Sequence, residues 1–302
     1  QSELKQVDHE FQIRLQLDEV YDRVSHMNIA MRLKDIDKFK HQTLSESLEI
    51  LDLIKASKST TSKTKAFEIL SFAYTINDKL EESIDISKES IELLNLTNSA
   101  QKYKLISAYK DIVSAYLKLK DFTNAKDYLH KTITLFTNRN ANYFRMKSLE
   151  YLLYAFSKDY DNLYKITQEV IALKELKQYK VLQEEWKLRE AYTNILVEAS
   201  KISPAALSTK KQNSFRLNKF LNEVSFFSKD KRGTNISILV AELVHFLIRK
   251  EYDKLLERLD ALNQYTYRYL RNDHTLRSNC FIKMLLKLPE AEYHPIRTVR
   301  YV

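Results

Sequence analysis

The side chains that most often perform chemistry are present in this sequence but form no recognisable set. Seven histidines are scattered along the 302 residues, and none stands four residues from another. His274 and Cys280 are six residues apart, which places them on different faces of a helix. Because a protein metal site needs several converging ligands, we predict no metal site.

No nucleophile stands in a pattern that would activate it. The sequence has no Walker motif, no glycine-rich dinucleotide turn and no Ser-His-Asp order on strand-to-helix elbows. Cys280 lies in the apolar run NCFIKMLL, where a small core residue is a better interpretation than a nucleophile. The carboxylates are spread as on solvated helix faces. We therefore predict that the chain is not an enzyme and has no catalytic residue and no cofactor.

The composition predicts the class of fold that must position any functional residue. One Gly and three Pro in 302 residues provide little for turns with positive φ, glycine loops or β-bulges. The hydrophobic content of 44% is enough for a substantial core. No apolar run approaches the ~20 residues that span a bilayer. The prediction is an all-α protein without a membrane span.

One pattern of three residues recurs along the chain. Tyr116, Phe122 and Ala125 are separated by six and then three residues. Apolar residues at helical spacing precede and follow this triplet, so it should join two antiparallel helices through a turn of about four residues. The small third residue lets the helices approach closely, and the aromatic in the turn closes their seam. The same spacing recurs as Tyr74–Leu80–Ser83, Tyr154–Tyr160–Leu163 and Phe246–Tyr252–Leu255.

These triplets resemble the tetratricopeptide repeat (TPR). The resemblance implies a right-handed superhelical solenoid of antiparallel helical hairpins. The intervals between third residues, Ser83 to Ala125 and Ala125 to Leu163, exceed the usual repeat of ~34 residues. In this they are similar to the long-repeat variety of bacterial signalling regulators. The resemblance implies a non-catalytic scaffold or sensor module that binds a protein or peptide in a concave groove.

We expect one α-solenoid of about five or six hairpins over the whole chain. A degenerate amino-terminal cap covers residues 1–56, and three clear repeats cover 65–176. An irregular hairpin is expected at 179–228, and a carboxy-terminal repeat with a capping helix, which begins near Tyr265, at 235–288. The stretches 55–64 and 228–235 are the strongest loops. Residues 289–302 are expected to be a tail or linker.

The first helix of each hairpin should line the groove. The groove residues predicted to contact a partner are Phe72, Lys110, Ser114, Lys118, Arg145 and Leu152. Three of them are cations, which predicts a partner with acidic character. Family members that clamp a terminal carboxylate use Lys, Asn and Arg at fixed positions, and here only Arg145 agrees. Since Glu68, Phe72, Asp111 and Leu149 stand at the other matching positions, that clamp is disfavoured.

A basic stretch leaves a second interpretation open. The net charge is +9, and residues 208–232 hold seven Lys and Arg against two acids. Lys210, Lys211, Arg216 and Lys219 alternate with aromatic and apolar residues, as in segments that track phosphates. The alternative function is therefore the TPR portion of a transcriptional or signalling regulator that contacts nucleic acid there.

Cysteine usage and the first residue bear on location. A single cysteine excludes an internal disulfide and is typical of a reducing compartment, which predicts a cytoplasmic protein. Because the sequence begins at Gln1 rather than Met, we expect further residues upstream.

Overall fold

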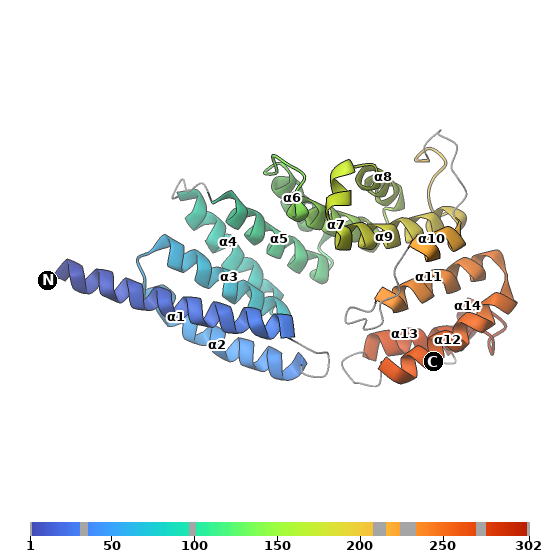
Figure 1. Cartoon of the computed structure of the whole chain (residues 1–302), viewed down its shortest axis with the longest axis horizontal. Helices are drawn as coiled ribbons and strands as arrows, with labels where there is room; N and C mark the ends of the chain where they lie inside the picture. Colours follow the sequence, from blue (N-terminus) through green and yellow to red (C-terminus); the bar gives the residue numbers. More distant parts are fainter. Residues whose placement is uncertain are drawn as a thin grey trace. The chain divides into compact units, whose positions relative to one another are not determined.

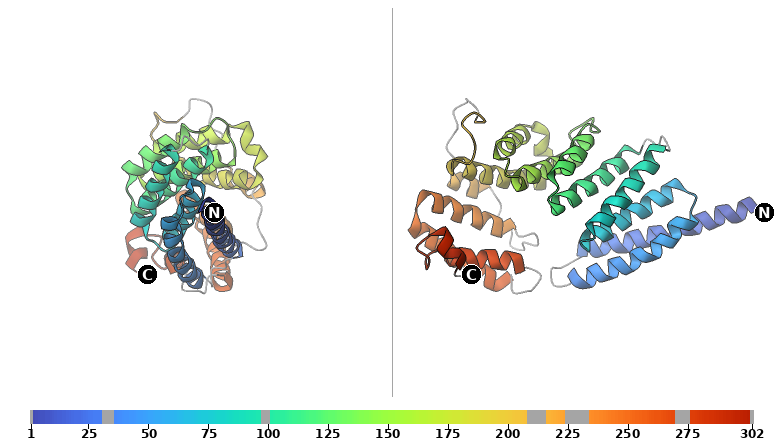
Figure 2. Two further views of the ribbon diagram at one scale, coloured as in Figure 1. Left: turned by 90° about the vertical axis from the view of Figure 1, so that its left-hand side faces the viewer. Right: turned by 180° about the vertical axis from the view of Figure 1, so that it is seen from behind.

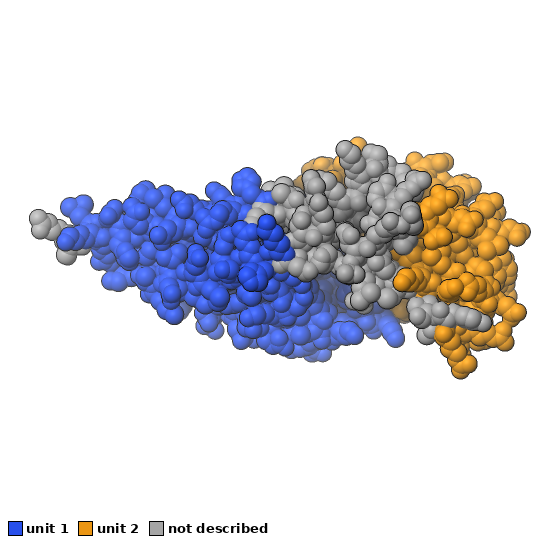
Figure 3. Space-filling model, turned by 90° about the horizontal axis from the view of Figure 1, so that it is seen from below, with its two compact units in different colours: residues 1–158 blue, residues 159–302 orange. Residues whose placement is uncertain are grey.

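The computed structural model describes residues 2–30, 36–96, 101–207, 216–223, 234–269 and 276–300. These residues form helices joined by turns and contain no strand, which confirms the predicted all-α class (Figure 1). Successive helices pack against one another. The chain divides into two compact units, Gln1–Lys158 and Asp159–Val302 (Figure 3). The division falls inside the last of the three repeats expected at 65–176.

Unit 1 is a stack of helices in chain order (Figures 1 and 2). Helix α1 packs against α2 and α3, helix α3 against α4 and α5, and helix α5 against α6 and α7. Each helix therefore contacts mainly its neighbours in sequence, as in a repeat array. The helices are α1 Ser2–Ala30, α2 Ile36–Ala56, α3 Thr60–Ile76, α4 Leu80–Leu96, α5 Lys102–Leu119, α6 Phe122–Ile133 and α7 Ala141–Phe156.

Unit 2 is built in the same way around a separate core. Helices α11 and α12 form a hairpin, and α11 also packs on α9. Their buried face includes Leu239, Leu243, Leu255 and Leu259. The helices are α8 Tyr160–Ile171, a 3₁₀ helix at Lys174–Gln178, α9 Lys180–Glu198, α10 Leu217–Glu223, α11 Thr234–Arg249, α12 Tyr252–Tyr269, α13 Leu276–Leu286 and α14 Pro295–Arg300.

The six-residue spacing in the repeated triplet has a cause in the backbone. At the end of α5 the amide of Asp121 donates to the carbonyl of Tyr116 at 3.0 Å. Lys120 between them takes the left-handed conformation, with φ of 62°. The Asp121 carboxylate then accepts the amide of Asn124 at 3.1 Å, which starts the next helix. One helix-ending motif is thus followed at once by an N-cap.

The same turn closes other hairpins. The amide of Lys79 donates to the carbonyl of Tyr74 at 2.9 Å, and that of Glu251 to the carbonyl of Phe246 at 3.0 Å. A non-glycine residue stands at positive φ in each turn, because the chain has only one glycine. These residues are Asp78, Lys120, Lys158 and Lys250.

We expected the middle residue of the triplet to lie inside the turn, and this is wrong for Phe122. Phe122 is the first residue of α6, because the turn is complete at Asp121. Its side chain packs on the cluster that contains Ala125, which is fully buried between α5 and α6. The expected role of the small third residue is consistent with this packing.

Several element boundaries differ from the expectation. The loop expected at 55–64 is reduced to residues 57–59, because Ser59 caps α3 and the helix begins at Thr60. Tyr265 does not start the final helix, since α12 continues to Tyr269 and α13 begins at Leu276. The carboxy-terminal tail is also partly helical. Pro295 stands at the first position of α14, where its missing amide costs nothing.

Candidate functional site

Helices α1, α3 and α5 of unit 1 enclose a hollow of about 180 Å³, called here the outer hollow. The three helices lie next to one another because each is the first of its hairpin. Its wall combines apolar side chains from α1 and α3 with polar ones from α3 and α5. The lining residues are Tyr21, Val24, Glu68, Ile69, Phe72, Ser107, Lys110 and Asp111.

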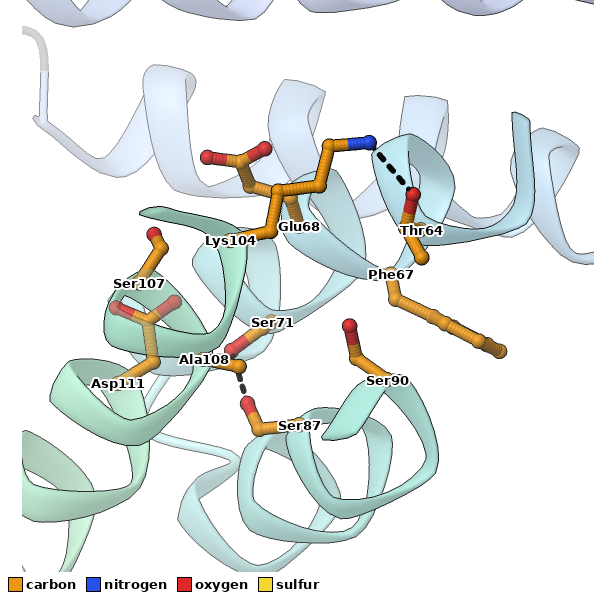
Figure 4. A pocket seen from close by; sticks show the side chains of 10 residues that line it. All are labelled: Thr64, Phe67, Glu68, Ser71, Ser87, Ser90, Lys104, Ser107, Ala108 and Asp111. Carbon is orange, nitrogen blue, oxygen red and sulfur yellow. Dashed lines mark hydrogen bonds between the residues drawn. The ribbon is translucent and has the colours of Figure 1, made fainter. Parts of the chain in front are cut away.

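A narrower hollow of about 20 Å³, the inner hollow, lies between α3, α4 and α5. It shares Glu68, Ser107 and Asp111 with the outer hollow. Hydroxyl groups dominate its wall, and α4 contributes two of them, from Ser87 and Ser90. Figure 4 shows the ten lining residues: Thr64, Phe67, Glu68, Ser71, Ser87, Ser90, Lys104, Ser107, Ala108 and Asp111.

Two carboxyl groups stand where the hollows meet. Burial raises the pKa of Glu68 above its ordinary value of 4.5, and the nearby Asp111 raises it further. Burial also raises the pKa of Asp111, although its side chain is still 21% exposed. Both shifts show that the folded chain disfavours the charged form of each group.

The cations near these carboxylates have other contacts. The ammonium of Lys104 donates to the hydroxyl of Thr64 at 2.8 Å (Figure 4). Lys110 approaches Asp111 at 3.4 Å, and its side chain is 45% exposed. Lys65 pairs with Asp18 and lies 4.7 Å from the centre of the Tyr21 ring. Glu68 makes no hydrogen bond and no ion pair with any described residue.

The hydroxyl groups of the inner hollow divide into two sets. Ser71 bonds to Ser87 at 2.8 Å and to Ser83 at 3.1 Å, which ties α3 to α4. Ser90 is only 7% exposed, and its hydroxyl makes no hydrogen bond with the described residues. In Figure 4 this hydroxyl points toward the space between the other lining side chains. The wall of the inner hollow therefore includes a hydroxyl that is available to a bound group.

The structure brings two of the six predicted groove residues into the outer hollow. Phe72 lines it and meets the ring of Phe39 edge-on, with centroids 6.3 Å apart. Lys110 lines it beside Asp111. Ser114 instead donates its hydroxyl to the carbonyl of Lys110 at 2.8 Å, within its own helix.

The other three predicted groove residues lie away from both hollows. Lys118 donates to the carbonyl of Thr75 at 3.0 Å and lies 3.6 Å from Asp78. Arg145 of α7 is exposed, and its guanidinium donates to Asn142 at 3.1 Å. Leu152, also of α7, packs partly buried against the core of α5 and α6.

Sequence reasoning missed Tyr21, Val24, Ile69 and Ser107. The first two belong to α1, where the repeated triplet cannot be read. Ser107 stands four residues before Asp111, and this helical spacing was the only indication that it shares the site.

Of the predicted basic contact, Lys210 and Lys211 lie outside the described residues. Arg216 and Lys219 flank or belong to α10, and both are exposed. Leu217 and Phe220 of the same segment are buried in the unit 2 core, which confirms their core spacing.

The described residues contain neither a cluster of metal ligands nor a helix suited to a membrane. In the part of the chain that the structure describes, no three His, Cys, Asp or Glu side chains gather closely enough to hold a metal ion. Among the described helices, none has the length and apolar character needed to cross a membrane. Comparison with protein-family models and with curated protein sequences found no match to this chain.

Proposed function

We propose that unit 1 is a non-catalytic binding module that receives a segment of a partner protein at the outer hollow. The observation that carries this proposal is the hollow itself, which three neighbouring helices line with both apolar and ionisable side chains. Such a mixture is typical of sites that hold a ligand in a defined orientation. No set of nucleophile, base and oxyanion donor stands beside it among its lining residues.

The proposal includes the repeat family. Stacked helical hairpins with the same turn support membership of the tetratricopeptide-repeat superfamily and a right-handed superhelix. A scaffold or sensor role, as in the long-repeat bacterial regulators, follows from that membership. Repeat arrays use the surface of successive first helices for binding, because those helices lie side by side.

The test uses the full chain and a synthetic library of nonapeptides. Their ends are acetylated and amidated, so that they carry no terminal charge. Phe72→Ser removes an apolar wall of the outer hollow, and we expect at least about a tenfold loss of peptide affinity. Leu96→Ser is the matched control, because Leu96 ends α4 and is 84% exposed. Peptides that bind both variants as well as the parent would exclude this site.

A further inference from the structure

We propose that the carboxylates of Glu68 and Asp111 receive the ammonium group of a lysine side chain from the partner segment. This inference rests on the proposed function and names the chemistry that the site selects. It differs from the acidic partner that the sequence predicts from Lys110, Lys118 and Arg145.

The outer hollow fits the stem of such a side chain. Its apolar wall is formed by Val24, Ile69 and Phe72, and Phe72 stands one helical turn after Glu68 in α3. A lysine has four methylene groups, which pack on apolar surface while the charged head contacts polar groups. The hollow of about 180 Å³ is large enough for one such side chain but not for a folded element.

The inner hollow fits the head. With a volume of about 20 Å³ it admits a group the size of a water molecule, which describes an ammonium better than a planar guanidinium. An ammonium has three donors and needs three acceptors. Neither Glu68 nor the hydroxyl of Ser90 makes a hydrogen bond with a described residue, and both line the inner hollow. Asp111 supplies the third acceptor, which the incoming ammonium shares with Lys110, its ion-pair partner at 3.4 Å.

Of the protein's own cations near the two carboxylates, Lys110 is paired with Asp111, whereas Lys104 makes its hydrogen bond elsewhere. Lys104 is held by the Thr64 hydroxyl, and Lys118 is held by Thr75 and Asp78. The raised pKa values of Glu68 and Asp111 agree, because they remain raised although Lys104 and Lys110 lie nearby. A bound ammonium would therefore offset an electrostatic penalty that the free protein carries.

The experiment measures retention of four peptide pools on the immobilised full chain. Each pool consists of acetylated, amidated nonapeptides with a fixed central Lys, Arg, norleucine or Glu and uncharged residues elsewhere. Norleucine keeps the apolar stem and lacks the ammonium. We expect the Lys pool to be retained about tenfold more than the norleucine pool, the scale of one charge-assisted hydrogen bond. The net charge of +9 opposes this result, so non-specific attraction cannot produce it.

Two variants locate the effect. Glu68→Gln combined with Asp111→Asn should remove the preference for Lys over norleucine. The control combines Asp85→Asn with Glu92→Gln, which changes the same residue types at exposed positions of α4 and should keep the preference. Lys104→Met removes a competing like charge, and it should increase retention of the Lys pool.

Each other outcome has a definite meaning. If peptides bind and Phe72→Ser releases them, but Lys and norleucine pools are retained equally, the ammonium site is wrong and the proposed function stands. Preferential retention of the Glu pool, lost in Lys104→Met, would overturn the inference in favour of an acidic ligand. Equal retention of the Arg and Lys pools would overturn the fit to an ammonium. Retention of no pool would overturn both proposals.

Discussion

At the scale of single residues, the notable feature is a pair of carboxyl groups that the fold disfavours in their charged form. Glu68 and Asp111 have raised pKa values, mainly through burial. Asp78 shows the opposite case, because hydrogen bonding to Lys40 lowers its pKa. Exposed pairs of that kind contribute little to stability, whereas a partly buried carboxylate without a hydrogen bond, such as that of Glu68, reduces it. Groups that reduce stability are often kept for binding.

Glu68→Gln should stabilise the protein at neutral pH. A carboxyl whose pKa rises on folding favours the folded state below its unfolded pKa, and this contribution is lost as pH increases through the folded pKa. The glutamine avoids that loss, so we expect a gain of about 1 kcal/mol at pH 7 that disappears below about pH 4.5. Urea unfolding at both pH values measures it. Glu92→Gln, on the exposed side of α4, serves as the control, and an equal gain there would contradict the explanation.

Lys120→Gly should also stabilise the protein. Lys120 has φ of 62°, a conformation that costs a residue with a Cβ atom about 1–2 kcal/mol. Glycine removes that cost and adds backbone entropy to the unfolded chain, which leaves a gain of about 0.5–1 kcal/mol. Lys126→Gly, within α6 and exposed, should instead lose about 1 kcal/mol. Thermal unfolding measures both variants. If both substitutions shift the melting temperature in the same direction, the left-handed conformation assigned to Lys120 is wrong.

At the scale of the helices, Tyr116 connects successive hairpins. Its ring packs against three apolar clusters and lies 5.8 Å from that of Tyr128. Its carbonyl also accepts the bond that ends α5. Tyr116 therefore contributes its side chain to the packing between helices and its carbonyl to the turn that ends α5.

Tyr116→Ala should cost roughly 3 kcal/mol of unfolding free energy, at the lower end for large-to-small aromatic changes because the ring is only partly buried. Tyr103→Ala in the same helix is the control, since that side chain is 66% exposed. Chemical denaturation with circular dichroism measures both. If the two substitutions have equal effects, the assigned packing of α5 is wrong.

At the scale of the whole molecule, the division into two compact units suggests that each has its own core. Residues 1–158 expressed alone should therefore give a strongly helical circular dichroism spectrum and a cooperative thermal transition. Helices that contact mainly their sequence neighbours can keep their packing when distant parts are removed. A spectrum typical of an unfolded chain, or a transition without cooperativity, would contradict this.

The sequence by itself determined the helices and their turns, because these depend on local interactions. The spacing from Tyr116 to Phe122 reflects one bond from Asp121 to Tyr116 and one N-cap, all within nine residues. The positions of the triplets therefore coincide with four turns between helices, three of which join helices that pack as hairpins: α3 with α4, α5 with α6 and α11 with α12. The position of the last helices was less well predicted, because α12 continues past Tyr265 and no proline marks a break there.

Only the tertiary structure decided which charges remain available. From the sequence, Lys110 and Lys118 were cations on a binding face, and Glu68 and Asp111 were mismatches to a family pattern. Folding places Lys118 beside Asp78, which lies in the turn between α3 and α4. It leaves Glu68 without a hydrogen bond or ion pair among the described residues. Packing also adds Tyr21 from α1 to the site. Such pairings join residues about forty or more positions apart, so no local pattern encodes them.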